Sequence, residues 1–296
     1  MSTPRFLDLP PGVTPQKIET PQGTFAALEA LPVSGVIERW PALLVPGLTG
    51  SKEDFIAVLM TLAHSGRRVV AVDLRGQYET PGPDDPEAYT CPALGADVDA
   101  LAQVIGGGDP MHLVGHSFGG LVTREAVIDG RTRFASYTLM SSGPAAIEGL
   151  RAVNGRKIVE ELPVLGIEHL WHHKFEPEAL AVDVPDEVLA FLHRRLTSNS
   201  PTGMVCMAEQ VLSMGDRTDE LRQVDVPTLV LYGEHDDGWT PETQSEMAAR
   251  LGAECVVVPG AVHSPAVEAP ETTATALVTF WNTAEKHFLD TRSNVM

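Results

Sequence analysis

The fold is decided by residues 111–120, which read Met-His-Leu-Val-Gly-His-Ser-Phe-Gly-Gly. Their apolar, β-prone start predicts a strand, and small and apolar residues at helical spacing from Leu121 to Ile128 predict a helix. Between the two lies Gly-x-Ser-x-Gly, a tight and strained turn that would hold the serine hydroxyl clear of the sheet. Composition alone supplies this pattern in roughly one chain of ten. Ser117 is therefore a candidate nucleophile whose partners have to be found elsewhere in the chain.

Strand and helix patterns alternate on both sides of this unit. Continuous apolar runs predict buried strands, and amphipathic segments between them predict helices. Such alternation implies right-handed crossovers and a mainly parallel sheet flanked by helices. A hairpin that turns at Pro21-Gln22-Gly23 precedes the sheet. The predicted buried strands are 41–45, 67–73, 111–116, 136–140, 227–232 and 254–258.

A helical insertion interrupts this alternation. From about residue 145 to residue 225 the pattern is helical and no clear strand intervenes. We therefore expect residues 1–144 and 226–296 to form one core, and residues 145–225 to form a helical cap. Apolar side chains in and near the insertion would either line a substrate pocket under the cap or simply pack in its interior. The candidates for such a pocket are Trp171, Met207 and Trp239.

Charge and cysteine content argue against several classes of function. The chain has 40 acidic and 21 basic residues, and the resulting net charge of −19 repels nucleic acids and anionic membrane surfaces. Its three cysteines are far apart and lack metal-binding spacing, which is typical of free thiols in a reducing compartment. The chain shows neither a signal-peptide core nor a run of ~18 apolar residues. We expect a cytoplasmic protein without membrane insertion.

Motifs for bound groups are not apparent in the sequence. It contains no nucleotide-binding loop, haem motif or metal-ligand framework. We therefore expect no cofactor and no metal, and a small-molecule substrate as the partner. The sequence does not determine the oligomeric state.

Two further strand ends could supply the partners of Ser117. A serine hydroxyl needs a base to take its proton, and the base needs a carboxylate to fix its tautomer. In an open parallel sheet, these groups should follow the carboxyl ends of other strands. One such end carries Gly-Glu-His-Asp-Asp at residues 233–237, and the other carries Gly-Ala-Val-His at residues 260–263. The resulting order along the chain is serine, acid, histidine.

With these motifs in place, the chain resembles the α/β-hydrolase family. The resemblance rests on five motifs in the family's order, at residues 46–50, 73–76, 115–120, 233–236 and 260–263. It implies the α/β-hydrolase fold, with a cap in the insertion. It also implies Ser117 as the nucleophile, His263 as general base and acid, and Asp236 as the carboxylate. The oxyanion would be held by the backbone N–H groups of Leu48 and Phe118.

The sequence departs from the family's pattern at two places. The first loop begins Pro46-Gly47 where the family usually has His-Gly, so the histidine that often supports this loop is missing. The family commonly has Gly-x-x-Asp, with a proline four residues after the acid. Counted forward from Gly233 the acid is Asp236, whereas counted back from Pro241 it is Asp237. We favour Asp236 because spacing from the strand end sets direction more tightly, and Asp237 is the second choice.

The leading functional hypothesis is a serine hydrolase that cleaves an ester, thioester or lactone of a small, largely apolar substrate through an acyl-enzyme on Ser117. Carbon–carbon bond hydrolases and cofactor-free perhydrolases use the same three residue types, so they stay open as alternatives. A ligand-binding protein that keeps the fold without catalysis is a third possibility.

Overall fold

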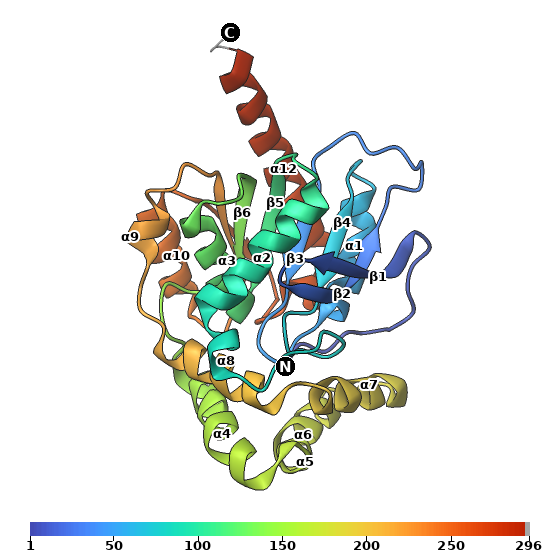
Figure 1. Ribbon diagram of the computed structural model, residues 1–296, viewed down its shortest axis with the longest axis vertical. Helices are drawn as coiled ribbons and strands as arrows, with labels where there is room; N and C mark the ends of the chain where they lie inside the picture. Colours follow the sequence, from blue (N-terminus) through green and yellow to red (C-terminus); the bar gives the residue numbers. More distant parts are fainter. Residues whose placement is uncertain (294–296) are drawn as a thin grey trace.

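The chain folds around one eight-stranded sheet (Figure 1). The structure is a computed structural model and describes residues 1–293. The strand order is β1-β2-β4-β3-β5-β6-β7-β8. Strands β1 and β2 form the predicted hairpin, β2 also pairs antiparallel with β4, and the other neighbours pair in parallel. The strands are β1 (Val13–Thr20), β2 (Gly23–Ala30), β3 (Ala42–Val45), β4 (Val69–Val72), β5 (Met111–His116), β6 (Phe134–Met140), β7 (Thr228–Gly233) and β8 (Glu254–Val258).

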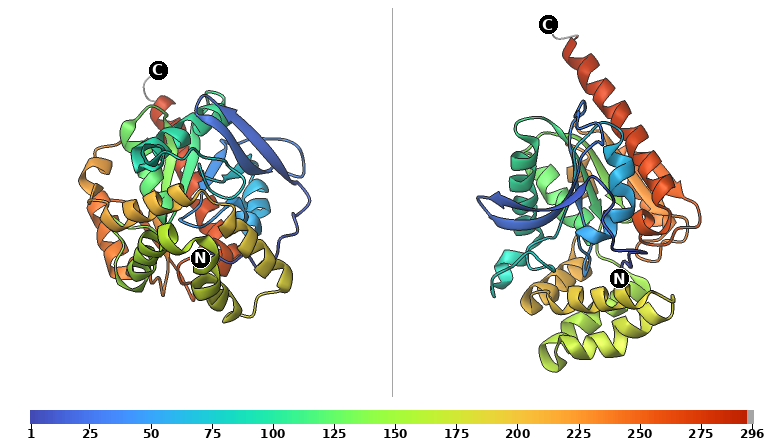
Figure 2. Two further views of the ribbon diagram at one scale, coloured as in Figure 1. Left: turned by 60° about the horizontal axis from the view of Figure 1, so that its bottom comes forward. Right: turned by 90° about the vertical axis from the view of Figure 1, so that its right-hand side faces the viewer.

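Helices cover both faces of this sheet, as Figure 1 and Figure 2 show. Helices α2, α3 and α10 pack on one face, and α1, α11 and α12 pack on the other. Strands β3 to β6 are buried along their whole length because both faces are covered, which explains their continuous apolar sequences. The predicted fold class is confirmed. These helices are α1 (Ile56–Ala63), α2 (Cys91–Gly106), α3 (Phe118–Asp129), α10 (Pro241–Leu251), α11 (Pro265–Glu268) and α12 (Pro270–Ser293), with 3-10 turns at Lys52–Phe55 and Pro86–Tyr89.

The insertion after β6 forms a separate helical layer at the carboxyl ends of the parallel strands (Figure 1). Its helices have an apolar core of their own, which includes Trp171, Phe191 and Met204. A π-helical turn, Trp171–Phe175, links two short helices within it. We call helices α4 to α8 the cap. They are α4 (Gly149–Leu165), α5 (Ile167–Leu170), α6 (Glu176–Leu180), α7 (Asp186–Thr197) and α8 (Pro201–Ser213).

The last part of the insertion lies on the core and not in the cap. Helix α9 (Thr218–Leu221) packs against α3 and α10. Ion pairs fasten this segment, because Arg217 pairs with Glu125 of α3 and Arg250 of α10 pairs with Asp216 at 2.6 Å. The helical layer over the site is therefore shorter than the predicted 145–225 range.

A buried ion pair joins the cap to the core. Arg195 of α7 is fully buried, and its Nη1 lies 2.7 Å from Oδ1 of Asp54 in the 3-10 turn after β3. Its Nη2 donates to the carbonyl oxygen of Ser2 at 2.6 Å. Breaking a buried pair by removing one partner costs about 3–5 kcal/mol. The contact thus holds α7 firmly against the core.

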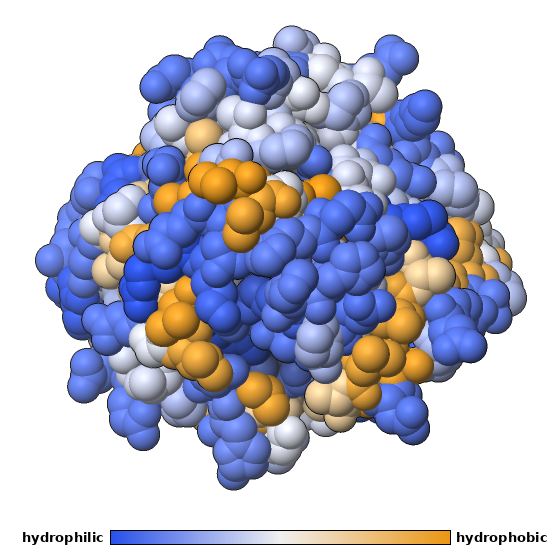
Figure 3. Space-filling model, turned by 90° about the horizontal axis from the view of Figure 1, so that it is seen from below, coloured by the Kyte–Doolittle hydropathy of each residue, from blue (hydrophilic) through white to orange (hydrophobic). Residues whose placement is uncertain are grey.

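The outer face of the cap is mostly polar, with apolar side chains in separate groups (Figure 3). Scattered exposed apolar side chains are normal on a protein surface. Within residues 1–293, no helix combines the length and apolar character that crossing a membrane requires. The exposed apolar residues of the cap and its loops include Leu150, Val164, Leu165, Leu180 and Val182.

Candidate active site

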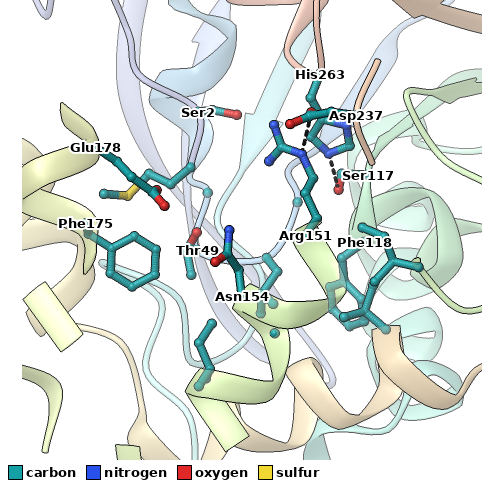
Figure 4. Close-up of a pocket in the computed structure, with 18 of the residues that line it drawn as sticks. Ser2, Thr49, Ser117, Phe118, Arg151, Asn154, Phe175, Glu178, Asp237 and His263 are labelled. Carbon is teal, nitrogen blue, oxygen red and sulfur yellow. Dashed lines mark hydrogen bonds and ion pairs between the residues drawn. The ribbon is translucent and has the colours of Figure 1, made fainter. Parts of the chain in front are cut away.

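Ser117 lies at the turn between β5 and α3, with φ 54° and ψ −122°. A positive φ is rare for a residue with a side chain and stores roughly 1–3 kcal/mol of backbone strain. The turn is held in place by the Ser117 N–H, which donates to the carbonyl of Met140 on β6 at 2.9 Å. This geometry puts the Ser117 hydroxyl at the edge of a cavity under the cap (Figure 4).

A chain of hydrogen bonds links Ser117 to a histidine and a carboxylate. Nε2 of His263, in the loop after β8, lies 2.8 Å from Oγ of Ser117. Nδ1 of the same ring lies 2.7 Å from Oδ1 of Asp236, in the loop after β7. Asp236 also accepts hydrogen bonds from the Gly238 N–H at 2.8 Å and from Nε2 of Gln244 at 3.0 Å. The first-choice carboxylate of the sequence analysis is thus the one that contacts His263.

Asp237 occupies a different environment. Its side chain is 48% exposed and pairs with Nε of Arg151, on α4 of the cap, at 2.6 Å. Ligand atoms of Asp236, Asp237 and His263 lie within 4.8 Å of one another, which is close enough for a metal site. The two ring nitrogens of His263 already contact Ser117 and Asp236, so a cation bound to this ring would displace one of these two contacts.

The electrostatic environment keeps His263 neutral and Asp236 charged. Burial lowers the pKa of His263 to about 4, because its effect outweighs that of the hydrogen bond that Nδ1–H donates to Asp236, and the positive charge of Arg151 lowers the pKa further. Burial alone would raise the pKa of Asp236, but the hydrogen bond with His263 and the donors from Gly238 and Gln244 lower it. At neutral pH the imidazole can therefore accept a proton from Ser117, and the carboxylate can stabilise the resulting cation.

This pKa has a measurable consequence for the pH dependence of catalysis. A base works only when deprotonated, so a lowered pKa keeps His263 active at lower pH. We expect kcat/KM for a neutral ester to stay nearly constant from pH 6.5 down to about one pH unit above the pKa of His263, and to fall to half near pH 4. The measurement is a pH–rate profile, with circular dichroism at each pH to restrict it to folded protein. A midpoint at pH 6.5 or above would contradict the assignment.

The loop that carries His263 is positioned by two neighbours. Nε2 of the buried His116 lies 2.7 Å from the backbone oxygen of His263. His116 therefore helps to hold the His263 loop in place. On the other side, Gly238 packs so closely on the imidazole that a Cβ there would overlap its Cε1 atom. No pattern in the sequence indicates this requirement, which becomes visible only in the folded loop.

Two backbone N–H groups border the same cavity. Leu48 follows β3 and Phe118 begins α3, and both residues line the cavity with Ser117. Within the part of the chain that the structure describes, no acceptor pairs with either N–H. Gly47 lets the first loop approach, since a Cβ there would lie 2.9 Å from Cβ of Ser117. The two donors are thus available to an oxygen atom of a bound molecule.

Gln77 supports the first loop, where the family's usual histidine is missing. Its side chain is buried, and Nε2 donates to the carbonyl oxygen of Gly47 at 3.0 Å. The Gly50 N–H donates to the same oxygen at 3.0 Å. Because the Gly47–Leu48 peptide is trans, its N–H points opposite to its carbonyl. Gln77 therefore helps to direct the Leu48 N–H away from the protein interior.

Replacing Gln77 should impair this donor. Gln77→Met keeps the length of the side chain but cannot hold the Gly47 carbonyl. We expect kcat for an ester to fall about tenfold or more with little change in KM, because an oxyanion exists only in the transition state. Steady-state kinetics measure both values, with the exposed Gln103→Met as the matched control. An unchanged kcat, or an equal loss in both variants, would rule out this positioning role.

The same turn corrects one expectation about its neighbours. Closeness in the sequence predicts that Arg75 pairs with Asp73, but in the structure Arg75 pairs with Asp97 of α2, with its Nε 2.8 Å from Oδ2. Asp73 is buried and instead accepts from the backbone N–H and from Nζ of Lys52, at 2.8 and 2.9 Å. Lys52 follows the first loop directly. The residue 73–80 turn thus fastens that loop at a second point.

The cavity beside Ser117 has a volume of about 240 Å³. Trp171, Met207 and Trp239 do not line it. Trp171 lies in the core of the cap, Met207 packs in the core beneath it, and the Trp239 N–H donates to the carbonyl of Ala145 at 3.0 Å. The cap contributes α4 and the turn before α6 to its walls, and the core contributes the first loop and the Ser117 turn (Figure 4). Its apolar lining includes Phe118, Ile147, Leu150, Ile158, Phe175 and Val211.

The cysteines are all free thiols. Cys91 is buried in α2, and burial raises the pKa of its thiol to about 12. A thiol with this pKa stays protonated at neutral pH and is a poor nucleophile. Cys91 is therefore a much weaker candidate nucleophile than Ser117.

Comparison with known proteins agrees with this geometry. Residues 42–276 match the model of the alpha/beta hydrolase family. A Variovorax paradoxus protein named "Putative carbamate hydrolase RutD" is 30% identical over 233 residues, which are 73% of this chain and 81% of that protein. A proline iminopeptidase of Lactobacillus helveticus is 26% identical over 73% of this chain and 80% of its own length.

Solved structures resemble the whole chain. A thermophilic esterase from Thermogutta terrifontis superposes with a TM-score of 0.73 and 26% identity, and the match covers 92% of this chain and 99% of the esterase. An enol-lactonase from Burkholderia xenovorans, at 20% identity and a TM-score of 0.72 over 90% of this chain and all of its own, shares the fold. With its fold, its strand-end motifs and these matches, the chain belongs to the alpha/beta hydrolase family.

Proposed function

We propose that this protein is a serine hydrolase that cleaves a carboxylic ester, thioester or lactone through an acyl-enzyme on Ser117. The observation that carries the proposal is the hydrogen-bonded series Ser117–His263–Asp236, next to two unpaired backbone donors. Hydrolases of this class need a nucleophile, a base and an oxyanion site within one small space. The name of the similar esterase supports an ester bond as the target.

The reaction would proceed in two halves. Oγ of Ser117 bonds to the carbonyl carbon while Nε2 of His263 takes its proton, and the carbonyl π electrons move to the oxygen. The N–H groups of Leu48 and Phe118 hold that oxyanion. When the carbonyl re-forms, the alcohol or thiol leaves with the proton from His263. Water then repeats the sequence and releases the acid and free Ser117.

The cavity favours a small substrate. Its volume of about 240 Å³ is below the usual range for drug-sized ligands, and much of its wall is apolar. We propose that the cap, helices α4 to α8, limits the size of the acyl or alcohol group. In this proposal the core carries out the reaction and the cap selects the substrate.

A substrate panel tests the function. The panel contains esters of graded acyl and alcohol size, a thioester and a lactone, and hydrolysis is followed by release of the alcohol, thiol or acid. Incubation with a fluorophosphonate, followed by mass spectrometry, should show one adduct on the peptide that contains Ser117. Failure to hydrolyse any member of the panel, together with the absence of an adduct, would refute the proposal.

A further inference from the structure

Arg151 presents unused hydrogen-bond donors to the cavity. It lies near the start of α4, and its side chain is 28% exposed. Only its Nε has a partner, Asp237, and among the residues that the structure describes no acceptor pairs with Nη1 or Nη2. Figure 4 shows the guanidinium of Arg151 beside Asp237, at the edge of the open part of the cavity. A guanidinium with both terminal nitrogens free matches the geometry of a carboxylate.

Two further polar groups face the same space. Asn154 lies one helical turn after Arg151 on α4, and Thr49 belongs to the first loop (Figure 4). Neither side chain forms a hydrogen bond with the residues that the structure describes. Unpaired polar groups in a partly apolar cavity are normally satisfied by a ligand or by water. Together with Arg151 they form a set of donors opposite Ser117.

The other basic groups of the cavity are less able to bind an anion. Burial lowers the pKa of the Met1 amino group, which also lines the cavity, to about 6, so this group is mostly uncharged at neutral pH. Nζ of Lys174, in the π-helical turn, lies 3.1 Å from Oε1 of Glu178 on α6 and 5.0 Å from the centre of the Phe175 ring. Asp237, by contrast, is half exposed, so water can hydrate it while Arg151 binds a second anion. Arg151 is therefore the cation with capacity left for a ligand.

We propose that Arg151 anchors a carboxylate of the substrate, so that preferred substrates are esters that carry a free carboxylate in addition to the bond that is cleaved. This inference rests on the proposed function and narrows its substrate class. The apolar wall would receive the carbon chain between the two groups, while Asn154 and Thr49 would donate to or accept from polar atoms along it. In the unliganded protein, Asp237 holds the guanidinium in place.

Matched pairs of substrates test the proposal. The first pair is monoethyl adipate and the ethyl ester of adipic acid monoamide, which differ by one charge on the acyl side. The second pair, 4-carboxyphenyl and 4-carbamoylphenyl butanoate, puts that charge on the leaving group. In at least one pair we expect kcat/KM to be about 10- to 100-fold higher for the anion. This factor corresponds to the usual contribution of a hydrogen bond to a charged group. Equal values in both pairs would overturn the inference.

Three variants assign the effect to Arg151. Arg151→Gln should bring the ratio of anionic to neutral kcat/KM close to one, whereas Asp237→Asn should raise it, because a competing negative charge is removed. Lys174→Gln should leave the ratio near its wild-type value. If the Arg151–Asp237 pair only fastened the cap, both of its variants would change kcat/KM for the anionic and the neutral substrate by the same factor. A ratio that survives in Arg151→Gln, or that depends on Lys174 instead, would overturn the proposal.

A binding experiment separates this inference from the proposed function. Calorimetric titration of the Ser117→Ala protein with uncleaved monoethyl adipate and with its amide analogue measures anchoring without turnover. We expect tighter binding of the anion, and loss of this difference when Arg151→Gln is added. Anion-selective binding without hydrolysis in the wild type would refute only the hydrolase function. Hydrolysis of neutral and anionic esters alike, with equal binding, would refute only the role of Arg151.

Discussion

Ser117→Ala should reduce hydrolysis of a small neutral ester by roughly 10⁴-fold or more. The methyl group cannot bond to the carbonyl carbon, so no acyl-enzyme forms, while His263 and the backbone donors stay in place. Initial rates on an ester with a chromogenic leaving group measure the loss. Labelling by a fluorophosphonate should disappear in the same variant, because the reagent reacts with the same oxygen.

The matched control for this variant is Ser264→Ala. Ser264 follows His263 directly, but its hydroxyl lies 2.8 Å from Oγ of Ser2 and does not contact the imidazole. The control removes a serine hydroxyl from the loop that carries His263, and it should keep both turnover and labelling. Substantial turnover in Ser117→Ala, at the level of the control, would mean that another group attacks the substrate.

Asp236→Asn should lower kcat about 10⁴-fold, and Asp237→Asn should cost no more than about tenfold on a neutral ester. An amide at position 236 cannot hold the imidazole in the tautomer that leaves Nε2 free to accept the Ser117 proton, and it carries no charge to stabilise the cation. At position 237 the change removes only the pair with Arg151. The two variants have the same chemistry one residue apart, so their kcat values can be compared directly.

The kcat values of these two variants also decide whether Asp236 or Asp237 supports His263 during catalysis. Equal losses, or a larger loss at Asp237, would show that the loop after β7 rearranges when substrate binds. Thermal unfolding of both variants should accompany the kinetics, because Asp236 also accepts hydrogen bonds from Gly238 and Gln244. A loss of activity without a loss of folded protein then belongs to the chemistry.

The sequence predicted those parts of the site that depend on strand ends. Ser117 follows the end of β5 directly, and Asp236 and His263 lie in the loops after β7 and β8. Parallel strands bring their carboxyl ends to one edge of a sheet. Local patterns therefore sufficed to bring these three residues together. The choice between Asp236 and Asp237 needed the folded loop, because neighbouring side chains in a turn point in different directions.

The parts that the sequence did not predict depend on packing between distant segments. Gln77 lies 30 positions after Gly47, and nothing in the residues around either one indicates their hydrogen bond. The cavity walls depend on which face α4 turns toward the core, so Arg151 and Phe175 line them while Trp171 packs inside the cap. Arg75 was misassigned for the same reason, since its partner Asp97 comes from a separate helix.

The contact between Arg195 and Asp54 bears on how far the cap can be exchanged in protein engineering. In the sequence the cap is one continuous insertion, which suggests a module that could be transplanted between scaffolds. Its anchor, however, spans both units: Asp54 belongs to the turn after the first loop, and a further hydrogen bond reaches Ser2. A chimera that receives this cap without Asp54 would bury the Arg195 guanidinium beside the first loop without a carboxylate to pair with it. Successful grafts should therefore carry both halves of the pair.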